Sequence, residues 1–299
     1  MKLGIEKSGF TKISDIQIPD IFYRRMKTGV DEFDEMFGEG ILPGSTFTIT
    51  AQAGCGKTTL LLQLMEALAN NNYDVGYASG EENQYQLAFT CNRLKVSNVS
   101  IANETDIDTL AKAMQDLDVL VIDSFQALTS SDNLNRAELE RYAVTTLINA
   151  AKTNECALFL VMHRTKDGKL KGSTLVPHAV DVNMEILMDE EGDEQDRVIS
   201  TYKNRFGPTH DYTARMTSHG FQLSGRREVS RAPSKKAHKK DLEQKILAIN
   251  EPPHITKERI IKEFNLTSSQ AYFALKELTD TGKLVKHGRG TSAVWKHAL

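Results

Sequence analysis

The stretch FTITAQAGCGKTT (47–59) decides the fold of this chain. FTIT is a short apolar run typical of a buried strand, and a helical pattern begins at Lys57. The segment AQAGCGKTT between and after them matches the phosphate-binding pattern G-x-x-x-x-G-K-[ST], with Ala51 at the place of the first glycine. Gly54 and Gly56 retain most of the backbone freedom that such a loop needs. A strand, this loop and a helix in succession predict a site for nucleotide phosphates.

The loop residues also indicate which nucleotide chemistry to expect. Backbone N–H groups of the turn and the helix N-terminus would cradle phosphate oxygens, and Lys57 would reach the β- and γ-phosphates. The Thr58 hydroxyl would bind Mg²⁺. We therefore expect ATP and Mg²⁺ as ligands. The residues expected to bind the nucleotide here are Ala53, Gly54, Cys55, Gly56, Lys57, Thr58 and Thr59.

Acidic residues follow two further predicted strands. Asp123 closes the apolar run VLVIDS, and ligands of open α/β sheets bind at such strand ends. We expect Asp123 to be the second Mg²⁺ ligand. The motif GEE follows the strand VGYAS, so Glu81 is expected to act as the base that orients water, with Glu82 as second choice.

His163 ends the predicted strand ALFLVMH. A polar side chain at that position could contact the γ-phosphate, and we include His163 among the nucleotide-binding residues. The alternative is a histidine that caps a helix or is merely exposed to solvent.

The order of apolar runs and helical patterns predicts an α/β fold with a mostly parallel central sheet covered by helices. An acidic segment, EEGDEQD, separates the last two strands and is typical of a hairpin tip. The expected strands are 47–50, 75–79, 119–124, 157–163, 183–189 and 197–204, and the expected helices are 57–70, 84–95, 106–115 and 136–153.

Composition narrows the class of protein. A length of 299 residues suits one large domain and a small one, and 40% apolar with 26% charged residues is ordinary for a globular protein. The three cysteines form no CxxC pair, which argues against a zinc finger or a disulfide framework and favours a reducing, cytoplasmic compartment. We see neither a signal-peptide pattern nor an apolar run long enough for a membrane span.

Changes in charge and in local composition divide the chain into parts. Residues 224–299 carry a net charge of +8 and the remainder −11, which suggests that the C-terminal part meets a polyanion. The segment 224–240 is basic and almost without large apolar residues, as in a flexible linker. After it, a helix, a helix–turn–helix and a hairpin follow in the order of a winged helix. The predicted parts are an N-terminal segment 1–26, an ATPase domain 27–223, the linker 224–240 and a winged-helix domain 241–299.

Several motifs together resemble a known family. MKTGVDEFDEMFGEGILPGS (26–45), the phosphate-binding loop, YASGEENQYQ, VLVIDSFQAL, HRTKDGKLKG and KNRFG occur in the order found in the bacterial RadA/Sms ATPases. This resemblance covers about 27–223. It implies a RecA-like P-loop NTPase fold and an ATP-driven motor on single-stranded DNA that assembles as a homo-hexamer or another ring or filament. The zinc finger and the Lon-protease-like domain of RadA are absent from this sequence, and the reduced core is similar to those of phage or plasmid replication helicases.

The resemblance assigns a further role to KNRFG (203–207). Its basic side chains, Lys203 and Arg205, are expected at the ATP of a neighbouring subunit. Two residues apart on a predicted strand, they would face the same side, and a cation there would stabilise the transition state as an arginine finger does. The alternative is a basic, exposed edge strand.

Besides the loop that follows Asp123, roughly 124–136, which is expected to line the centre of a ring, two regions are candidates for DNA contact. The loop RTKDGKLKGS (164–173) is basic and glycine-containing, as suits a loop that grips phosphates, although a merely solvated loop has the same composition. The second region is the helix 268–278 with the hairpin, which could also dock a replication or recombination protein. The residues expected to contact DNA are Arg164, Lys166, Lys169, Lys171, Gln270, Tyr272 and Arg289.

Three functions fit these features. The favoured one is an ATP-dependent DNA motor of the helicase or branch-migration type. A RecA-like strand-exchange ATPase is one alternative. A KaiC-like regulatory ATPase, with a winged helix that docks DNA or protein, is the other.

Overall fold

The computed structural model describes residues 11–163, 175–189, 192–227, 242, 245–249, 255–264, 268–288 and 293–297. Contacts between Cα atoms divide the chain into two compact units, Met1–Glu228 and Val229–Leu299, and each is considered by itself. Within the described ranges, no helix combines the length and the apolar character needed to cross a membrane.

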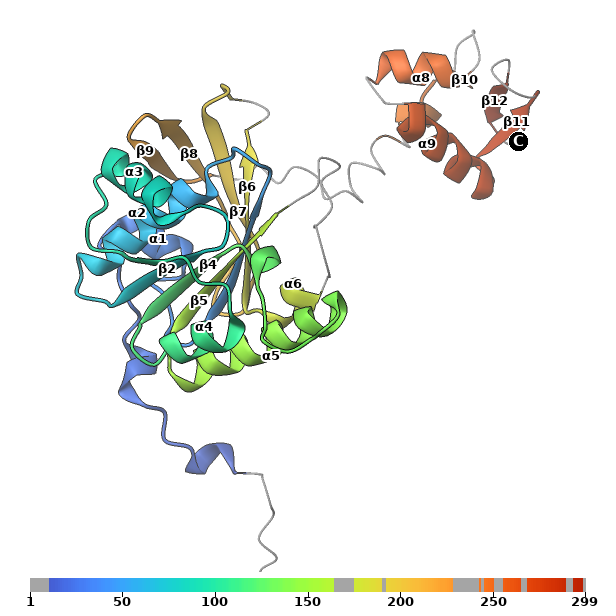
Figure 1. Ribbon diagram of the computed structural model, residues 1–299. Coiled ribbons are helices and arrows are strands. Elements are labelled where there is room, and N and C mark those ends of the chain that lie inside the picture. The colour runs from blue at the N-terminus through green and yellow to red at the C-terminus, as the bar shows by residue number, and fades with distance from the viewer. Residues whose placement is uncertain are drawn as a thin grey trace, which may run out of the picture. The chain divides into compact units, whose positions relative to one another are not determined.

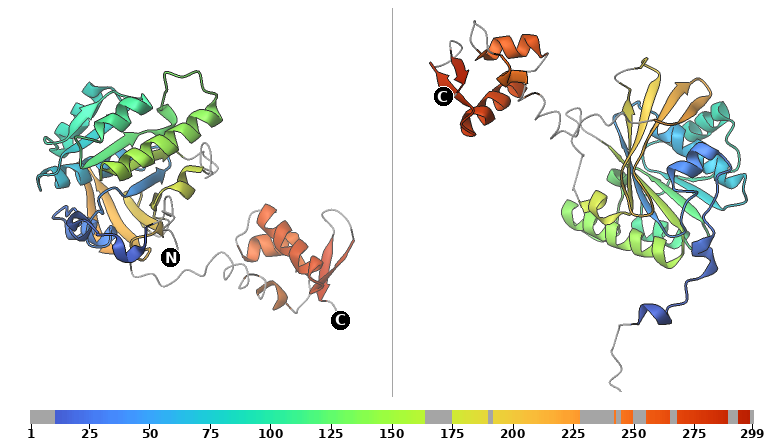
Figure 2. Two further views of the ribbon diagram at one scale, coloured as in Figure 1. Left: turned by 90° about the horizontal axis from the view of Figure 1, so that it is seen from below. Right: turned by 180° about the vertical axis from the view of Figure 1, so that it is seen from behind.

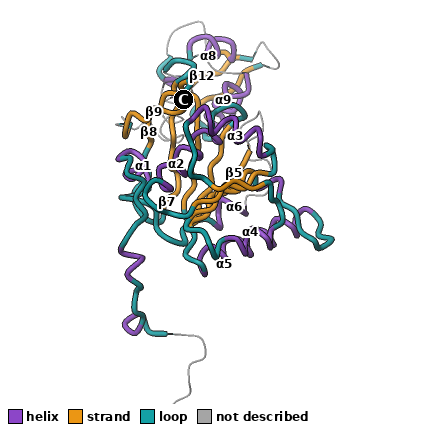
Figure 3. The backbone as a smooth tube through the Cα atoms, turned by 60° about the vertical axis from the view of Figure 1, so that its left-hand side comes forward, coloured by secondary structure: helices purple, strands orange, loops and turns teal. Residues whose placement is uncertain are grey.

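A nine-stranded sheet forms the centre of the first unit, in the order β3-β2-β4-β5-β1-β6-β7-β8-β9 (Figure 1). Neighbouring strands from β3 to β6 are parallel, and β7, β8 and β9 continue the sheet antiparallel. Figure 3 shows the strands as one twisted layer. The strands are β1 (Thr46–Ala51), β2 (Val75–Ser79), β3 (Ser100–Ala102), β4 (Val119–Asp123), β5 (Ala157–His163), β6 (Val182–Met188), β7 (Asp196–Asn204), β8 (Asp211–Thr217) and β9 (Gly220–Arg226).

Helices cover both faces of this sheet (Figures 1 and 2). Two separate apolar clusters fill the spaces between sheet and helices, one on each face. The helices of one face are α1 (Asp31–Met36), α2 (Lys57–Ala69) and α3 (Gln84–Leu94). Those of the other face are α4 (Ile107–Ala113), α5 (Arg136–Thr153) and α6 (Leu175–Ala179). Short 3-10 turns occur at η1 (Ile13–Asp15), η2 (Asp20–Tyr23) and η3 (Phe125–Ala127).

The central strand β1 is buried along its whole length although half of it is threonine. Alternation sends Phe47 to the α2 side, where its ring stacks on that of Phe159 at a centroid distance of 4.3 Å. The threonine hydroxyls point to the opposite face and donate hydrogen bonds there. Thr46 Oγ1 donates to Asp181 Oδ2 at 2.8 Å, and Thr48 Oγ1 donates to Asn183 Oδ1 at 2.6 Å. These bonds fix β6 beside the strand that carries the phosphate-binding loop.

The expected α/β fold with a mostly parallel sheet is confirmed, as are the six expected strands and four expected helices. The hairpin across the acidic segment is confirmed by the antiparallel pairing of β6 with β7. Strands β3, β8 and β9 were not predicted from the sequence. Because β9 ends at Arg226, the first residues of the expected linker belong to the sheet instead.

The second unit has its own apolar core, which includes Ile246, Ile260, Leu275 and Trp295. The Thr256 hydroxyl accepts a hydrogen bond from the backbone N–H of Arg259 at 3.1 Å, so Thr256 caps the helix that begins at Lys257. Its described elements include β10 (Ile255–Thr256), α8 (Lys257–Glu263), α9 (Ser268–Asp280), β11 (Leu284–His287) and β12 (Val294–His297). The three strands form an antiparallel sheet in the order β10-β12-β11.

Candidate functional site

The phosphate-binding loop joins the carboxyl end of β1 to the start of α2. Gly54 has a φ of +80° and Gly56 a φ of +96°, and only glycine adopts such angles at little cost. A Cβ atom on Gly56 would overlap Met216 Cε and would lie 2.8 Å from Phe221 Cε2. The loop is therefore packed tightly beneath side chains of β8 and β9.

Lys57 is the first residue of α2 and is 8% exposed. Its Nζ atom donates long hydrogen bonds of 3.4 Å to the carbonyl oxygens of Ala51 and Gln52. Burial lowers the pKa of the Lys57 ammonium, and the carboxylate of Asp123 opposes that shift. A cation whose hydrogen bonds to the described residues are long backbone contacts is suited to pair with a phosphate.

Asp123 ends β4 and is 6% exposed. Its Oδ2 atom accepts hydrogen bonds from the Tyr77 hydroxyl at 2.6 Å and from the Thr58 hydroxyl at 3.3 Å. Burial raises the pKa of Asp123, while the hydrogen bond from Tyr77 acts in the opposite direction. Thr58 and Asp123 thus offer neighbouring oxygen atoms, the ligand type that Mg²⁺ prefers.

Glu81 follows β2 and is held by a small polar network. Its Oε1 atom accepts a hydrogen bond from Ser124 Oγ at 2.7 Å and lies 2.7 Å from His163 Nε2. The Ser79 hydroxyl accepts hydrogen bonds from the backbone N–H groups of Glu81 and Glu82. The ligand atoms of Glu81, Asp123 and His163 all lie within 4.8 Å of one another. The carboxylate of Glu81 is therefore oriented before any ligand binds.

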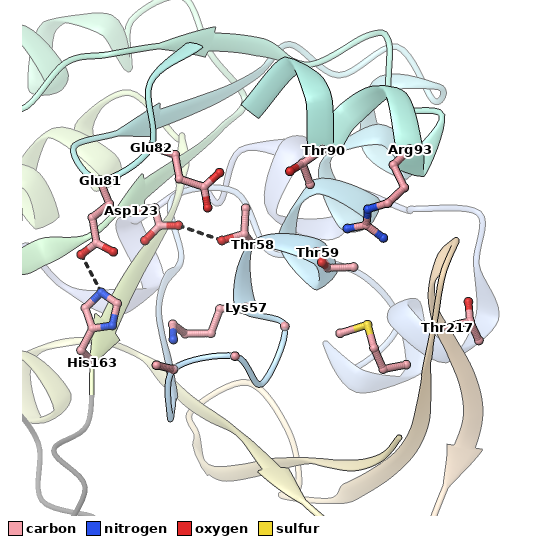
Figure 4. Close-up of a pocket in the computed structure, with 14 residues that line it drawn as sticks. Lys57, Thr58, Thr59, Glu81, Glu82, Thr90, Arg93, Asp123, His163 and Thr217 are labelled. Carbon is pink, nitrogen blue, oxygen red and sulfur yellow. Dashed lines mark hydrogen bonds and ion pairs between the residues drawn. The ribbon is translucent and has the colours of Figure 1, made fainter. Parts of the chain in front are cut away.

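These groups surround one cavity of about 520 Å³ (Figure 4). Cys55, also assigned to nucleotide binding, is 4% exposed and packs into the apolar core instead of lining the cavity. The other residues that the sequence assigned to the nucleotide all line it. The lining comprises Ala53, Gly54, Gly56, Lys57, Thr58, Thr59, Glu81, Glu82, Thr90, Arg93, Asp123, His163, Met216 and Thr217.

The far end of the cavity was missed in the sequence analysis. Thr90 and Arg93 lie three residues apart on α3 and so face the same side, a spacing that could have been noticed. Met216 and Thr217 come from β8, a strand that was not predicted. Figure 4 shows Arg93 and Thr217 at the side of the cavity opposite Glu81 and His163.

The basic pair of KNRFG lies outside this cavity. Lys203 Nζ donates to the carbonyl oxygens of Pro177, His178 and Val180 at 3.1, 3.0 and 2.5 Å, at the end of α6. Burial lowers the pKa of the Lys203 ammonium, and the nearby positive charge of Arg205 lowers it further. Lys203 lies on β7, as expected. Arg205 does not, because β7 ends at Asn204, so the expectation that both residues lie on one strand is wrong.

Arg205 is the more accessible member of the pair. Its guanidinium pairs with Asp181 at 3.1 Å, and its side chain is 53% exposed. Within one chain, therefore, Lys203 has its ammonium occupied by backbone oxygens, whereas much of the Arg205 guanidinium faces solvent.

Most of the residues expected to contact DNA lie outside the part of the chain that the structure describes. Arg164, Lys166, Lys169, Lys171 and Arg289 lie outside the described residues. Gln270 is on α9, and its side chain is likewise outside the described part. Tyr272 is 51% exposed on α9, and Lys257 Nζ lies 6.0 Å from the centroid of its ring.

Comparison with known sequences identifies a family and several relatives of this chain. The sequence model of a family described as the AAA domain matches residues 19–169. The DNA repair protein RadA of Salmonella typhimurium is 34% identical over 227 residues, covering 73% of this chain and 47% of that protein. RadA of Streptococcus pyogenes serotype M3 is 35% identical over 218 residues, covering 71% and 47%. The chain thus spans about half the length of the curated relatives it matches.

Solved structures share the fold of the first unit. The ATPase domain of G40P superposes with a TM-score of 0.57 at 14% identity, covering 66% of this chain and 90% of that domain. A DnaB-like replicative helicase, solved with its interactions with primase, gives a TM-score of 0.57 at 14% identity, covering 66% and 61%. At these identities the likeness concerns the fold alone.

Proposed function

Because the chain belongs to the AAA domain family, as a RadA-like P-loop ATPase of the RecA superfamily, we propose that it is an ATP-driven motor on DNA. It would bind and translocate on single-stranded DNA in replication or recombination. The relatives named for DNA repair and the DnaB-like helicase of the same fold support this proposal.

One observation carries the proposal. The carboxyl ends of β1, β2, β4 and β5 bring a lysine, three carboxylates and a histidine to one cavity. Lys57 supplies a cation, Asp123 a buried carboxylate, and Glu81 an oriented carboxylate beside Asp123. Phosphoryl transfer to water needs these three elements, because catalysis there depends on positioning and on charge stabilisation.

ATP would enter with its phosphates at the loop. Backbone N–H groups of residues 53–59 and the N-terminus of α2 would bind the phosphate oxygens, and Lys57 would move from its long carbonyl contacts to the β- and γ-phosphates. The nucleoside would occupy the other end of the cavity, between Thr90 and Arg93 on α3 and Met216 on β8.

The Thr58 hydroxyl and the Asp123 carboxylate fit a Mg²⁺ ion, because both are oxygen donors and their atoms are 3.3 Å apart. A Mg²⁺ ion held there would neutralise charge on the phosphate oxygens. Glu82 lies at the same rim, and burial raises the pKa of its carboxyl. Thr58 and Asp123 would hold the metal and leave room beside it for the phosphates of the nucleotide.

Glu81 would act as the general base. His163 and Ser124 hold its Oε1 atom from two sides, which leaves the second oxygen of the carboxylate to orient water. In this arrangement His163 serves the nucleotide site by fixing Glu81, and a contact of His163 with the γ-phosphate would require that bond to rearrange.

The assembly would be a homo-hexamer or another ring or filament. Arg205 is half exposed and is suited to reach the ATP of a neighbouring subunit. Lys203 would first have to leave the carbonyl oxygens at the end of α6. We therefore propose Arg205 as the principal cation supplied across the interface.

DNA would meet the motor at two places. The loop 164–173 follows directly on His163 at the end of β5, and its Arg and Lys side chains would grip the phosphates. We propose that the second unit is a winged helix, with α9 as its recognition helix and Tyr272 at the exposed surface. Residues Gln270 and Arg289 would extend that contact, or the unit would dock a replication or recombination protein.

The test is ATP turnover with and without single-stranded DNA. Lys57→Ala should abolish nucleotide binding, whereas Glu81→Gln should retain binding and lose turnover, since only the base is removed. Strong DNA stimulation of the unaltered protein, followed by unwinding of a forked duplex, would support the motor. Pairing of homologous strands without unwinding would favour a strand-exchange ATPase, and turnover indifferent to DNA would overturn the motor in favour of a regulatory ATPase.

A further inference from the structure

A buried tyrosine lies behind the nucleotide cavity and does not line it. Tyr77 is on β2 and is 1% exposed. In the parallel register of β2 with β4, Tyr77 is opposite Val121, and Ser79 is opposite Asp123. Tyr77 therefore reaches diagonally along one face of the sheet, a distance that a long aromatic side chain spans. Its hydroxyl ends 2.6 Å from Asp123 Oδ2.

The same carboxylate oxygen is shared with the phosphate-binding loop. Thr58 Oγ1 donates to Asp123 Oδ2 at 3.3 Å, so this atom lies between a strong donor from the sheet and a weaker one from α2. Asp123 is 6% exposed, and a carboxylate removed from water needs such donors to stay charged and oriented. The shorter bond, from Tyr77, is the one that sets the direction of the carboxylate.

We propose that Tyr77 is a positioning residue that fixes the Asp123 carboxylate for binding of the divalent cation that accompanies the nucleotide. The inference rests on the proposed function, in which Asp123 and Thr58 hold that cation. When a cation replaces the weak Thr58–Asp123 contact, the Tyr77 bond still restrains the carboxylate. Groups that orient metal ligands in this way commonly contribute about 10–100-fold to metal affinity.

The chain offers a matched control in Tyr212. This tyrosine, on β8, is also 1% exposed, but its hydroxyl has no hydrogen-bond partner among the described residues. Removing the hydroxyl from Tyr212 therefore tests the loss of a buried polar atom alone. Removing it from Tyr77 tests the bond to Asp123. Both changes to phenylalanine keep the ring and its packing.

The experiment uses the full chain and a fluorescent ADP analogue titrated with and without Mg²⁺, together with ATP turnover as a function of Mg²⁺ concentration. Tyr77→Phe should bind the analogue as before without Mg²⁺, but should need about tenfold more Mg²⁺ for half-maximal binding and turnover. Excess Mg²⁺ should restore turnover. Tyr212→Phe should match the unaltered protein in both assays.

Two results would overturn the proposal. One is a Tyr77→Phe variant whose Mg²⁺ dependence is unchanged. The other is a variant that loses nucleotide affinity equally with and without Mg²⁺, which would indicate a general packing defect. Neither readout requires DNA, so a failure of the motor hypothesis, seen as turnover indifferent to DNA, is distinguishable from a failure of this one.

Discussion

Replacing Gly56 by alanine should lower the free energy of unfolding of the first unit by about 2–5 kcal/mol. An alanine held at the observed φ of +96° is strained by roughly 1–2 kcal/mol. The added methyl group would also overlap Met216 Cε and would lie 2.8 and 2.9 Å from two atoms of the Phe221 ring. Forcing a methyl group into packed surroundings costs about 1–3 kcal/mol more, and the buried Phe221 ring has little room to yield.

Urea unfolding followed by far-ultraviolet circular dichroism measures this loss. Gly54→Ala is the control for backbone strain, because Gly54 has a φ of +80° but a Cβ atom added there would meet no other atom within 4 Å. It should lose only about 1–2 kcal/mol. The one tryptophan, Trp295, lies in the second unit, so its fluorescence follows a part of the chain that the substitution does not touch.

A double variant separates the two contributions. Met216→Ala removes the atom nearest to the new methyl group, so the combined loss in Gly56→Ala/Met216→Ala should be smaller than the sum of the single losses. Equal losses for Gly54→Ala and Gly56→Ala would refute the packing argument. Strict additivity in the double variant would do the same.

Two further predictions concern accessible groups. Arg205→Ala should cost about 1–3 kcal/mol of stability, because it removes the cation from the buried Asp181 carboxylate, which keeps its hydrogen bonds from Thr46, and it should reduce ATP turnover by about 10³-fold if Arg205 acts across subunits; thermal melting and turnover measured together decide this, and unchanged turnover excludes the role. Near neutral pH, a thiol reagent should modify Cys91 before the other two cysteines, and only slowly, because burial raises the pKa of the partly exposed Cys91, whereas Cys55 and Cys156 are buried and burial raises the pKa of Cys156 to about 12; fast modification of a second thiol would contradict the packing described.

The polar residues at strand ends could be predicted because the strands themselves are unambiguous. VLVID and ALFLVMH are continuous apolar runs, as in strands buried on both faces, so Asp123 and His163 fall at their carboxyl ends. Parallel neighbours bring such ends to one edge of a sheet, which places Glu81 beside them as well. The phosphate-binding loop, on β1 of the same sheet, then defines the cavity.

Other parts of the site depend on pairing that local sequence does not reveal. β8 and β9 are half-exposed antiparallel strands that include charged and glycine residues, so DYTARMT and GFQLSGR resemble loops. Their positions over Gly56 could not be anticipated without the sheet order. The bond from Tyr77 to Asp123 likewise requires β2 to lie beside β4, with β3 at the edge. Chain order alone would have placed β3 between them.

The position of His163, between the candidate DNA loop and Glu81, suggests how DNA could influence hydrolysis within the proposed motor. His163 is the last residue of β5, and the candidate DNA loop begins at the next residue. The same His163 holds Glu81, the proposed base, at 2.7 Å. A load on that loop would therefore act on the imidazole that orients the base, with no need for a longer path through the core. The ratio of turnover with and without DNA measures whether such coupling exists, and a ratio of one would overturn both this coupling and the proposed motor.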